Sequence, residues 1–176
     1  MIALLKQKTA SRSFLLIISM ALLLVGTTAA FVLRKADFKG DWTFNEGKSK
    51  LGEGRFRMAP QKLKVTSEGE SLTIERTNNT PNGETAKSSE KLTFDGKATE
   101  STVFGTAKKS SVAAWAASGE ELTINSTLTF ERDGQSFEIK TTEVWKLLDG
   151  GKTLSIDYTS VSQRGTTNQT FVYDKN

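Results

Sequence analysis

Residues 38–45 read FKGDWTFN, and this stretch decides the fold of the chain that follows it. Every second residue from Phe38 to Phe44 is apolar or glycine, whereas the residues between them are polar. This is the period-two pattern of a β-strand with one buried face. The alternation is the first one after an apolar N-terminal segment, so we expect it to be the first strand of a sheet.

The later chain repeats this pattern between turn signals and contains no helical periodicity. Apolar pairs such as Leu72 with Ile74 mark the strands, and Asn-Gly and Asp-Gly pairs mark hairpin turns. Turns recur roughly every 9 to 16 residues, which leaves room only for hairpin connections. We therefore expect an all-β, antiparallel up-and-down meander of about eight to ten strands. A sheet of that size buries one apolar face by closing into a barrel, with a β-sandwich as the alternative.

The composition excludes several classes of site. The 176 residues suit one domain, and they include no cysteine and no histidine. Disulfides, thiol catalysis, dyads with histidine and nearly all zinc, copper and haem sites are therefore excluded. We expect no cofactor, no metal site and no catalytic residue, because no pair of carboxylates stands out by its spacing. A dry pocket with two facing carboxylates would instead favour an enzyme that works without histidine.

The net charge of +4 does not indicate a nucleic-acid-binding protein. Lys6, Lys8 and Arg12 lie before the apolar segment, in a region without acidic residues. Without these three, the 24 basic residues become 21, against 20 acidic ones, and the two signs are interspersed. A protein that neutralises phosphates needs a basic face, so we expect no nucleic-acid partner.

Residues 14–33 carry no charge and follow the three basic residues. They fit either a secretory signal, with small residues at 28–30 for cleavage, or a retained membrane anchor. We predict an apolar helix here and two parts of the chain, with residues 1–35 as signal or anchor and 36–176 as one β-domain. Both alternatives place that domain outside the cytoplasm, with membrane contact only through the N-terminal segment.

The tripeptide Gly40-Asp41-Trp42, on the first strand of a meander of this length, resembles the Gly-x-Trp opening of the lipocalins. The longer form with Asn45 and Lys48-Ser49-Lys50 is similar to a group of secreted bacterial lipocalin-like domains. The likeness covers residues 38–176. The resemblance implies a lipocalin-like barrel and a structural role for Trp42.

Two features depart from the lipocalin pattern. Asp157 and Tyr158 follow Ile156 inside an expected strand, whereas lipocalins usually carry a Thr-Asp-Tyr motif in a later loop. Lipocalins also place an arginine near the last strand to pack on the first-strand tryptophan, and no arginine follows Gly165 here. The resemblance therefore does not imply a ligand class or receptor binding.

The barrel interior is the place where a ligand site is expected. An eight-stranded barrel is either filled by side chains or holds one small ligand, and ten strands favour a cavity. The sequence leaves both alternatives open. From the inward phase of the strands, the candidate ligand-binding residues are Trp42, Arg76, Phe94, Phe130, Trp145 and Tyr158.

Arg76 is the most informative candidate, because a charge inside a barrel is costly without a partner. It shares the phase of Ile74, just as Glu143 shares the phase of Trp145. Its guanidinium could hold the carboxylate of a fatty-acid-like ligand, with Tyr158 assisting. Alternatively, Arg76 lies at the end of a strand and points into water.

Residues 46–60 form the longest expected loop, which is rich in glycine and contains Arg55 and Arg57. A loop of this length is either a lid over a binding site or an Ω-loop that covers one end of the barrel. Together these features favour a monomeric, extracytoplasmic barrel that binds a small hydrophobic or amphipathic ligand. The alternative is an envelope domain with a filled barrel that binds a protein partner and no small molecule.

Overall fold

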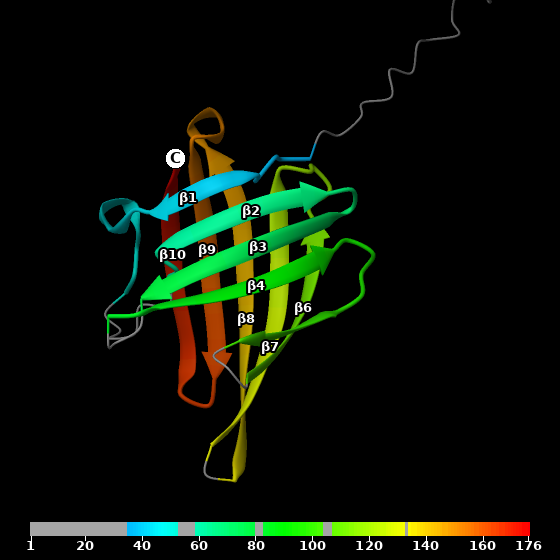
Figure 1. The fold of residues 1–176 in the computed structure, drawn as a ribbon, viewed down its shortest axis with the longest axis vertical. Coiled ribbons are helices and arrows are strands. Elements are labelled where there is room, and N and C mark those ends of the chain that lie inside the picture. The colour runs from blue at the N-terminus through cyan, green and yellow to red at the C-terminus, as the bar shows by residue number, and fades with distance from the viewer. Residues whose placement is uncertain (1–34, 53–58, 80–82, 104–106, 133) are drawn as a thin grey trace, which may run out of the picture. The chain divides into compact units, whose positions relative to one another are not determined.

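The computed structural model describes residues 35–52, 59–79, 83–103, 107–132 and 134–176. These residues form ten β-strands and two short 3-10 helices (Figure 1). The strands are β1 (Gly40–Phe44), β2 (Lys62–Glu68), β3 (Ser71–Asn79), β4 (Thr85–Thr93), β5 (Thr99–Val103), β6 (Ala107–Trp115), β7 (Glu121–Arg132), β8 (Gln135–Leu148), β9 (Thr153–Ser162) and β10 (Gly165–Lys175), and the 3-10 helices are η2 (Glu46–Lys48) and η3 (Asp149–Gly151). The predicted N-terminal helix lies outside the described residues. Within the described ranges, no helical segment has the length and apolar character that crossing a bilayer requires.

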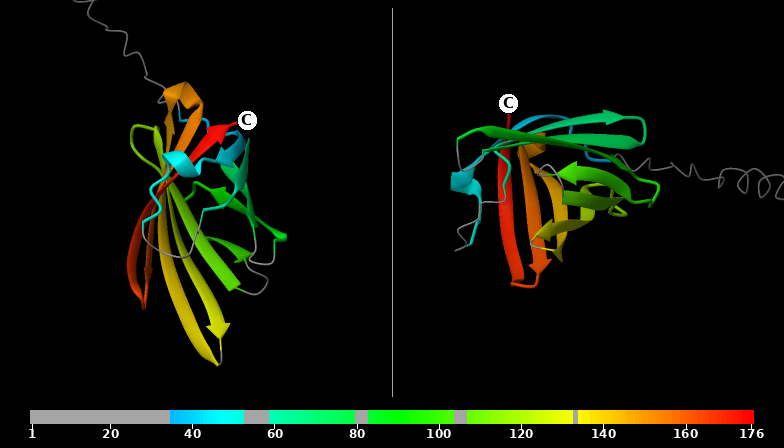
Figure 2. Two further views of the ribbon diagram at one scale, coloured as in Figure 1. Left: turned by 90° about the vertical axis from the view of Figure 1, so that its left-hand side faces the viewer. Right: turned by 60° about the horizontal axis from the view of Figure 1, so that its bottom comes forward.

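The ten strands form one antiparallel sheet in the order β4-β3-β2-β1-β10-β9-β8-β7-β6-β5. The first strand pairs with the last, with Trp42 of β1 opposite Lys175 of β10. The end strands are β4 and β5, and β4 lies beside β5 and β6 without a backbone ladder between them in the described residues. The sheet curls into a nearly closed barrel, in which β1 to β4 cross over β7 to β10 (Figure 1, Figure 2). The expected meander and barrel are thus confirmed, and the sandwich alternative is wrong.

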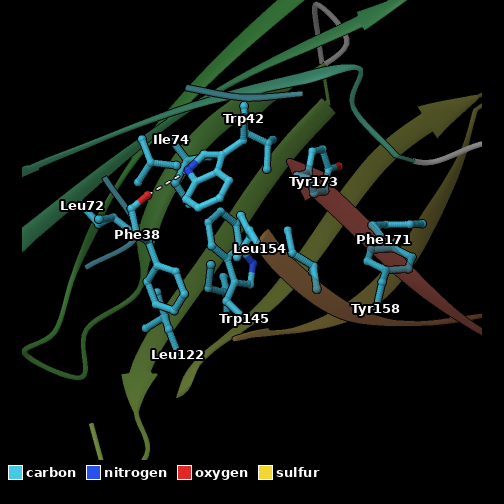
Figure 3. Packing of buried hydrophobic residues seen from close by; sticks show 14 of the residues in the cluster. Phe38, Trp42, Leu72, Ile74, Leu122, Trp145, Leu154, Tyr158, Phe171 and Tyr173 are labelled. Carbon is cyan, nitrogen blue, oxygen red and sulfur yellow. Dashed lines mark hydrogen bonds between the residues drawn. The ribbon is translucent and has the colours of Figure 1, made fainter. Parts of the chain in front are cut away.

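An apolar core fills one part of the barrel interior. Its largest fully buried side chains include Trp42, Trp145 and Phe38, which precedes β1. Phe38 stacks on Trp115 with ring centroids 5.6 Å apart and meets Trp145 edge-on at 5.7 Å. The Trp42 indole N–H donates to the Phe38 carbonyl oxygen at 2.9 Å (Figure 3). A shift of β1 by one residue would turn Trp42 outward, so burial of this aromatic group holds the register of the first strand.

The Gly-x-Trp opening has a structural reason in this barrel. Gly40 has a φ of +138°, and a Cβ atom there would lie 2.8 Å from Cε of Lys175. Without that Cβ, Lys175 passes over Gly40 and places its Nζ 5.1 Å from the centre of a Trp42 ring. Such a cation–π contact is favourable within about 6 Å. A lysine of the last strand therefore packs on the first-strand tryptophan.

The predicted inward phase is confirmed for most positions. Seven residues at positions that the alternation places on the inner face are buried, namely Trp42, Leu72, Ile74, Ile124, Trp145, Ile156 and Tyr158. Phe130 and Phe137 are only half-buried and stack on each other with ring centroids 5.5 Å apart. They lie near the end of the β7–β8 hairpin, which extends past its neighbouring strands (Figure 1). The period-two rule therefore holds in the body of the barrel but does not bury residues where a hairpin leaves it.

The loop expected at residues 46–60 is described at both ends. It begins with η2, where the Asn45 side chain accepts a hydrogen bond from the Lys48 backbone N–H at 3.1 Å. Lys50 then forms an isolated bridge with Thr170, so this part of the loop lies along β10. Arg55 and Arg57 lie outside the described residues, and the lid and Ω-loop interpretations both stay predictions.

Candidate ligand-binding cavity

A cavity of about 350 Å³ occupies the part of the barrel interior that the core does not fill. Along β8, the inward side chain of Trp145 belongs to the core, whereas those of Glu143 and Thr141 line the cavity. Along β3, Ile74 likewise belongs to the core and Arg76 lines the cavity. The apolar lining consists of Pro60, Leu63, Ala86, Val103, Leu128, Ile156 and Phe171, and the charged and hydroxyl-bearing lining includes Arg76, Lys87, Glu90, Lys109, Thr141, Glu143, Tyr158 and Tyr173. The barrel interior therefore has a packed part and a hollow part, and whether the hollow part holds a ligand stays a prediction.

Four charged side chains from four strands form one network in the cavity wall. Arg76 of β3 donates through Nη1 to Glu90 of β4, and through Nη2 to the two carboxylate oxygens of Glu143 of β8 at 3.2 and 3.1 Å. Lys109 of β6 donates to both carboxylate oxygens of Glu90 at 3.0 and 2.8 Å. Their side chains are between 5% and 13% exposed. Charges this deeply buried are tolerated because they are paired with one another.

Neutral donors complete the coordination of the two carboxylates. The Trp145 indole N–H donates to Oε2 of Glu143 at 2.8 Å, and the Ser111 hydroxyl donates to Oε2 of Glu90 at 3.3 Å. The contacts of Glu90 with Lys109 and Ser111 connect β4 to β6. They therefore bridge the side of the barrel where the sheet is open.

The network sets the charge state of Glu90 and Arg76. Burial raises the pKa of Glu90, but the neighbouring Arg76 and Lys109 outweigh burial and lower this pKa from 4.5 to about 2. For Arg76, burial lowers the pKa, but the charges of Glu143 and Glu90 outweigh it and raise the pKa above its usual range. Glu90 is therefore an anion and Arg76 a cation throughout the physiological pH range.

Two tyrosines, Tyr158 of β9 and Tyr173 of β10, add hydroxyl groups to the cavity wall. Burial is the main reason why the pKa of each is raised, so both hydroxyls keep their protons at neutral pH. For Tyr158, the nearby Ser160 side chain lowers the pKa, but burial outweighs it. The buried Tyr173 hydroxyl has no hydrogen-bond partner in the described part of the chain. An unsatisfied buried hydroxyl costs about 1–3 kcal/mol, and Tyr173 is 0% exposed, so its hydroxyl is closed off from a ligand in the cavity.

Two of the six candidate ligand-binding residues, Arg76 and Tyr158, lie in the cavity wall. The interpretation in which Arg76 points into water is wrong, because its side chain is 13% exposed and paired with two carboxylates. Trp42 and Trp145 lie in the packed core, and Trp145 reaches the network only through its indole N–H.

The other two candidates lie away from the cavity. Phe130 belongs to the stack on the β7–β8 hairpin. Phe94 packs beside Trp115, with ring centroids 5.5 Å apart, and both line a separate pocket of about 230 Å³. Whether any of the six contacts a ligand stays a prediction, but Arg76 and Tyr158 are the two that the fold brings together.

The sequence analysis missed Glu90 and Lys109, although a signal for Glu90 was present. Glu90 comes two residues before the buried Leu92 and lies opposite Ile74 of β3. The period-two rule that identified Arg76 would therefore have placed Glu90 inside as well. Lys109 lies in a segment of small and polar residues, AKKSSVAAW, whose weak alternation hides the inward phase.

The cavity contains two carboxylates, Glu90 and Glu143, which is the arrangement that would favour an enzyme. Both, however, are held by Arg76, and the lowered pKa of Glu90 makes it a poor proton donor near neutral pH. Among the described residues, no three or more acidic side chains gather in a way that would hold a metal ion. The geometry supports binding better than proton transfer.

Comparison with known proteins adds little to this description. A solved structure of zebrafish ileal bile acid-binding protein complexed with cholic acid is similar to this chain, with 15% sequence identity and a TM-score of 0.49. The match covers 79% of this chain and 98% of that one. No family model matches the sequence, and no curated protein matches it. A likeness this distant carries no argument about a ligand, so the functional argument rests on the cavity itself.

Proposed function

We propose that this barrel binds a small amphipathic molecule in its cavity. The observation that carries the proposal is a 350 Å³ cavity whose wall combines apolar side chains with hydroxyl-bearing ones such as Thr141 and Tyr158. Ligand pockets range from about 300 to 1,000 Å³ and combine an apolar lining with a few polar groups. This cavity has that volume and that mixture.

The apolar lining explains where the hydrophobic part of such a molecule would lie. Leu63, Leu128, Ile156 and Phe171 come from four different strands and face the same space. Burying apolar ligand surface against them contributes about 25 cal/mol per Å². The polar end of the ligand would lie toward the hydroxyl-bearing part of the wall, where Thr141 and Tyr158 can exchange hydrogen bonds with it.

We also propose that the barrel works outside the cytoplasm, as a carrier or store for its ligand. The support is the sequence of the N-terminal segment, in which three basic residues precede an uncharged run over residues 14–33. A fusion of residues 1–35 to a reporter that is active only after export tests this location. Activity of the reporter supports the proposal, and retention in the cytoplasm contradicts it.

Native mass spectrometry of the full chain, purified from its own host, tests the binding function. The mass before and after denaturation is compared for the unmodified chain, for Ala86→Trp and for Thr85→Trp. Ala86 lines the cavity, whereas the adjacent Thr85 is exposed, so only the first substitution fills the cavity. We expect a small molecule that is lost on unfolding in the unmodified chain and in Thr85→Trp, but not in Ala86→Trp. An empty chain that also fails to take up fluorescent lipid probes would contradict the proposal and favour a partner-binding domain.

A further inference from the structure

The charges of the buried network in the cavity wall balance one another. Lys87 also lines the cavity, but it is exposed to water, and an ion pair with an exposed side chain contributes only about 0–1 kcal/mol. Two cations, Arg76 and Lys109, are paired with two anions, Glu90 and Glu143. The chain of contacts runs Glu143, Arg76, Glu90, Lys109, and each member has an opposite charge beside it. The cavity wall therefore presents a neutral network whose charges are already satisfied.

A ligand carboxylate would disturb this balance in either of two ways. If it joined the network as a third anion, two cations would face three carboxylates at a site where the charged side chains are only 5–13% exposed. If it displaced Glu90 or Glu143 from Arg76, one protein carboxylate would lose the guanidinium. Among the described residues, Glu143 in particular would keep only the Trp145 indole N–H as a donor. A buried charge without a partner is strongly unfavourable.

A ligand cation meets the same obstacle with the opposite sign, since it would add a third positive charge to the network. An uncharged ligand does not. Its hydroxyl, carbonyl or amide group can exchange hydrogen bonds with hydroxyls of the cavity wall, such as those of Thr141 and Tyr158, which both donate and accept. No ion pair has to break for this contact to form.

We infer that the cavity selects uncharged amphipathic molecules with a hydrogen-bonding end group, and discriminates against fatty-acid-like anions of the same shape. This inference rests on the proposed function, because it presupposes that the cavity binds a ligand. It also reverses the role that the sequence suggests for Arg76. The guanidinium holds the two protein carboxylates and is not the anchor of a ligand carboxylate.

Decanamide and decanoate form a matched pair of probes, because they differ in charge but hardly in shape. Equilibrium dialysis of the full chain at pH 7.4, in buffer without detergent, measures the dissociation constant of each. We expect decanamide to bind at least about tenfold more tightly than decanoate. Decylammonium, the cationic analogue, is expected to bind as weakly as decanoate.

Glu143→Gln tests whether the charge balance causes this preference. The substitution keeps the shape of the side chain and an oxygen for the Trp145 N–H, but leaves two cations against one carboxylate. We expect the preference for decanamide to fall at least about tenfold, or to reverse. Glu121→Gln is the matched control, because Glu121 pairs with Lys146 at a site where both side chains are 41% exposed. It should leave the ratio unchanged.

The possible results separate the inference from the proposed function. Equal or tighter binding of decanoate by the unmodified chain would overturn the inference and leave the binding function intact. Binding of neither probe, together with no uptake of a neutral fluorescent lipid, would overturn both. If Glu143→Gln does not fold, the ratio of the decanoate and decanamide dissociation constants for the unmodified chain still tests whether the cavity prefers uncharged molecules. An unchanged ratio in a folded Glu143→Gln would overturn the charge-balance explanation.

Discussion

Arg76→Met is the sharpest test of the buried ion network, because Arg76 is the cation that two carboxylates share. After the substitution, Glu90 keeps Lys109 as a partner, but Glu143 keeps only the indole N–H of Trp145. The Glu143 side chain is 12% exposed, so water does little to stabilise its charge. Removing one partner of a buried ion pair typically lowers the free energy of unfolding by about 3–5 kcal/mol. We expect Arg76→Met to lower it by an amount in that range.

A second substitution shows whether the loss comes from the unpaired charge. Arg76→Met combined with Glu143→Gln removes the unpaired carboxylate and leaves the neutral pair of Glu90 with Lys109. We expect the double variant to be more stable than Arg76→Met alone, with a coupling energy of about 1–3 kcal/mol. A cavity left by the arginine side chain would not produce this recovery.

Urea unfolding followed by tryptophan fluorescence measures these free energies, with an unchanged m-value as the check that the fold is kept. Lys146→Met is the control, since the exposed pair of Lys146 with Glu121 is expected to contribute less than about 1 kcal/mol. The reasoning is refuted if Arg76→Met costs no more than this control. It is also refuted if the double variant is no more stable than the single one.

Three further predictions concern other features of the barrel. Gly40→Ala should lower the free energy of unfolding by about 1–3 kcal/mol, because the residue has a positive φ and its Cβ would meet Lys175. Gly69→Ala, with a positive φ but nothing within 4 Å of the added Cβ, should lower it by about 1 kcal/mol. Equal losses of the two variants in urea unfolding would contradict this prediction. Tyr173→Phe removes a buried hydroxyl without a partner among the described residues. The empty barrel should therefore keep its free energy of unfolding or gain up to about 1 kcal/mol. A clear loss in urea unfolding would show that the hydroxyl is already hydrogen-bonded. Folding lowers the pKa of Glu90 from 4.5 to about 2, so its contribution of about 3 kcal/mol is complete above pH 4.5 and is lost as the pH falls toward 2. Unfolding free energies measured from pH 6 to pH 2 should therefore fall less steeply for Glu90→Gln than for the unmodified chain, and parallel curves would argue against this assignment.

The sequence by itself determined the strands and the way in which they connect. Alternation along residues 38–45 and the Asp-Gly and Asn-Gly turns are local signals, since the phase of a side chain in a strand depends only on its neighbours in sequence. The same rule placed Arg76, Glu143 and Tyr158 on the inner face, where the structure has them. It was least reliable at Phe130, because a phase cannot tell where a hairpin leaves the barrel.

Only the tertiary structure decided which inward residues are core and which line the cavity. That division depends on how ten strands close, with the first strand paired to the last. The network of Arg76, Glu90, Lys109 and Glu143 likewise depends on four strands meeting, including β4 and β6, which share no backbone ladder in the described residues. Pairing of charges across a barrel is a contact between residues far apart in sequence, and no local pattern specifies it. The alternation along the chain indicated that the barrel has an interior. Barrel closure determined that the four charged side chains of the buried network are paired with one another before any ligand binds.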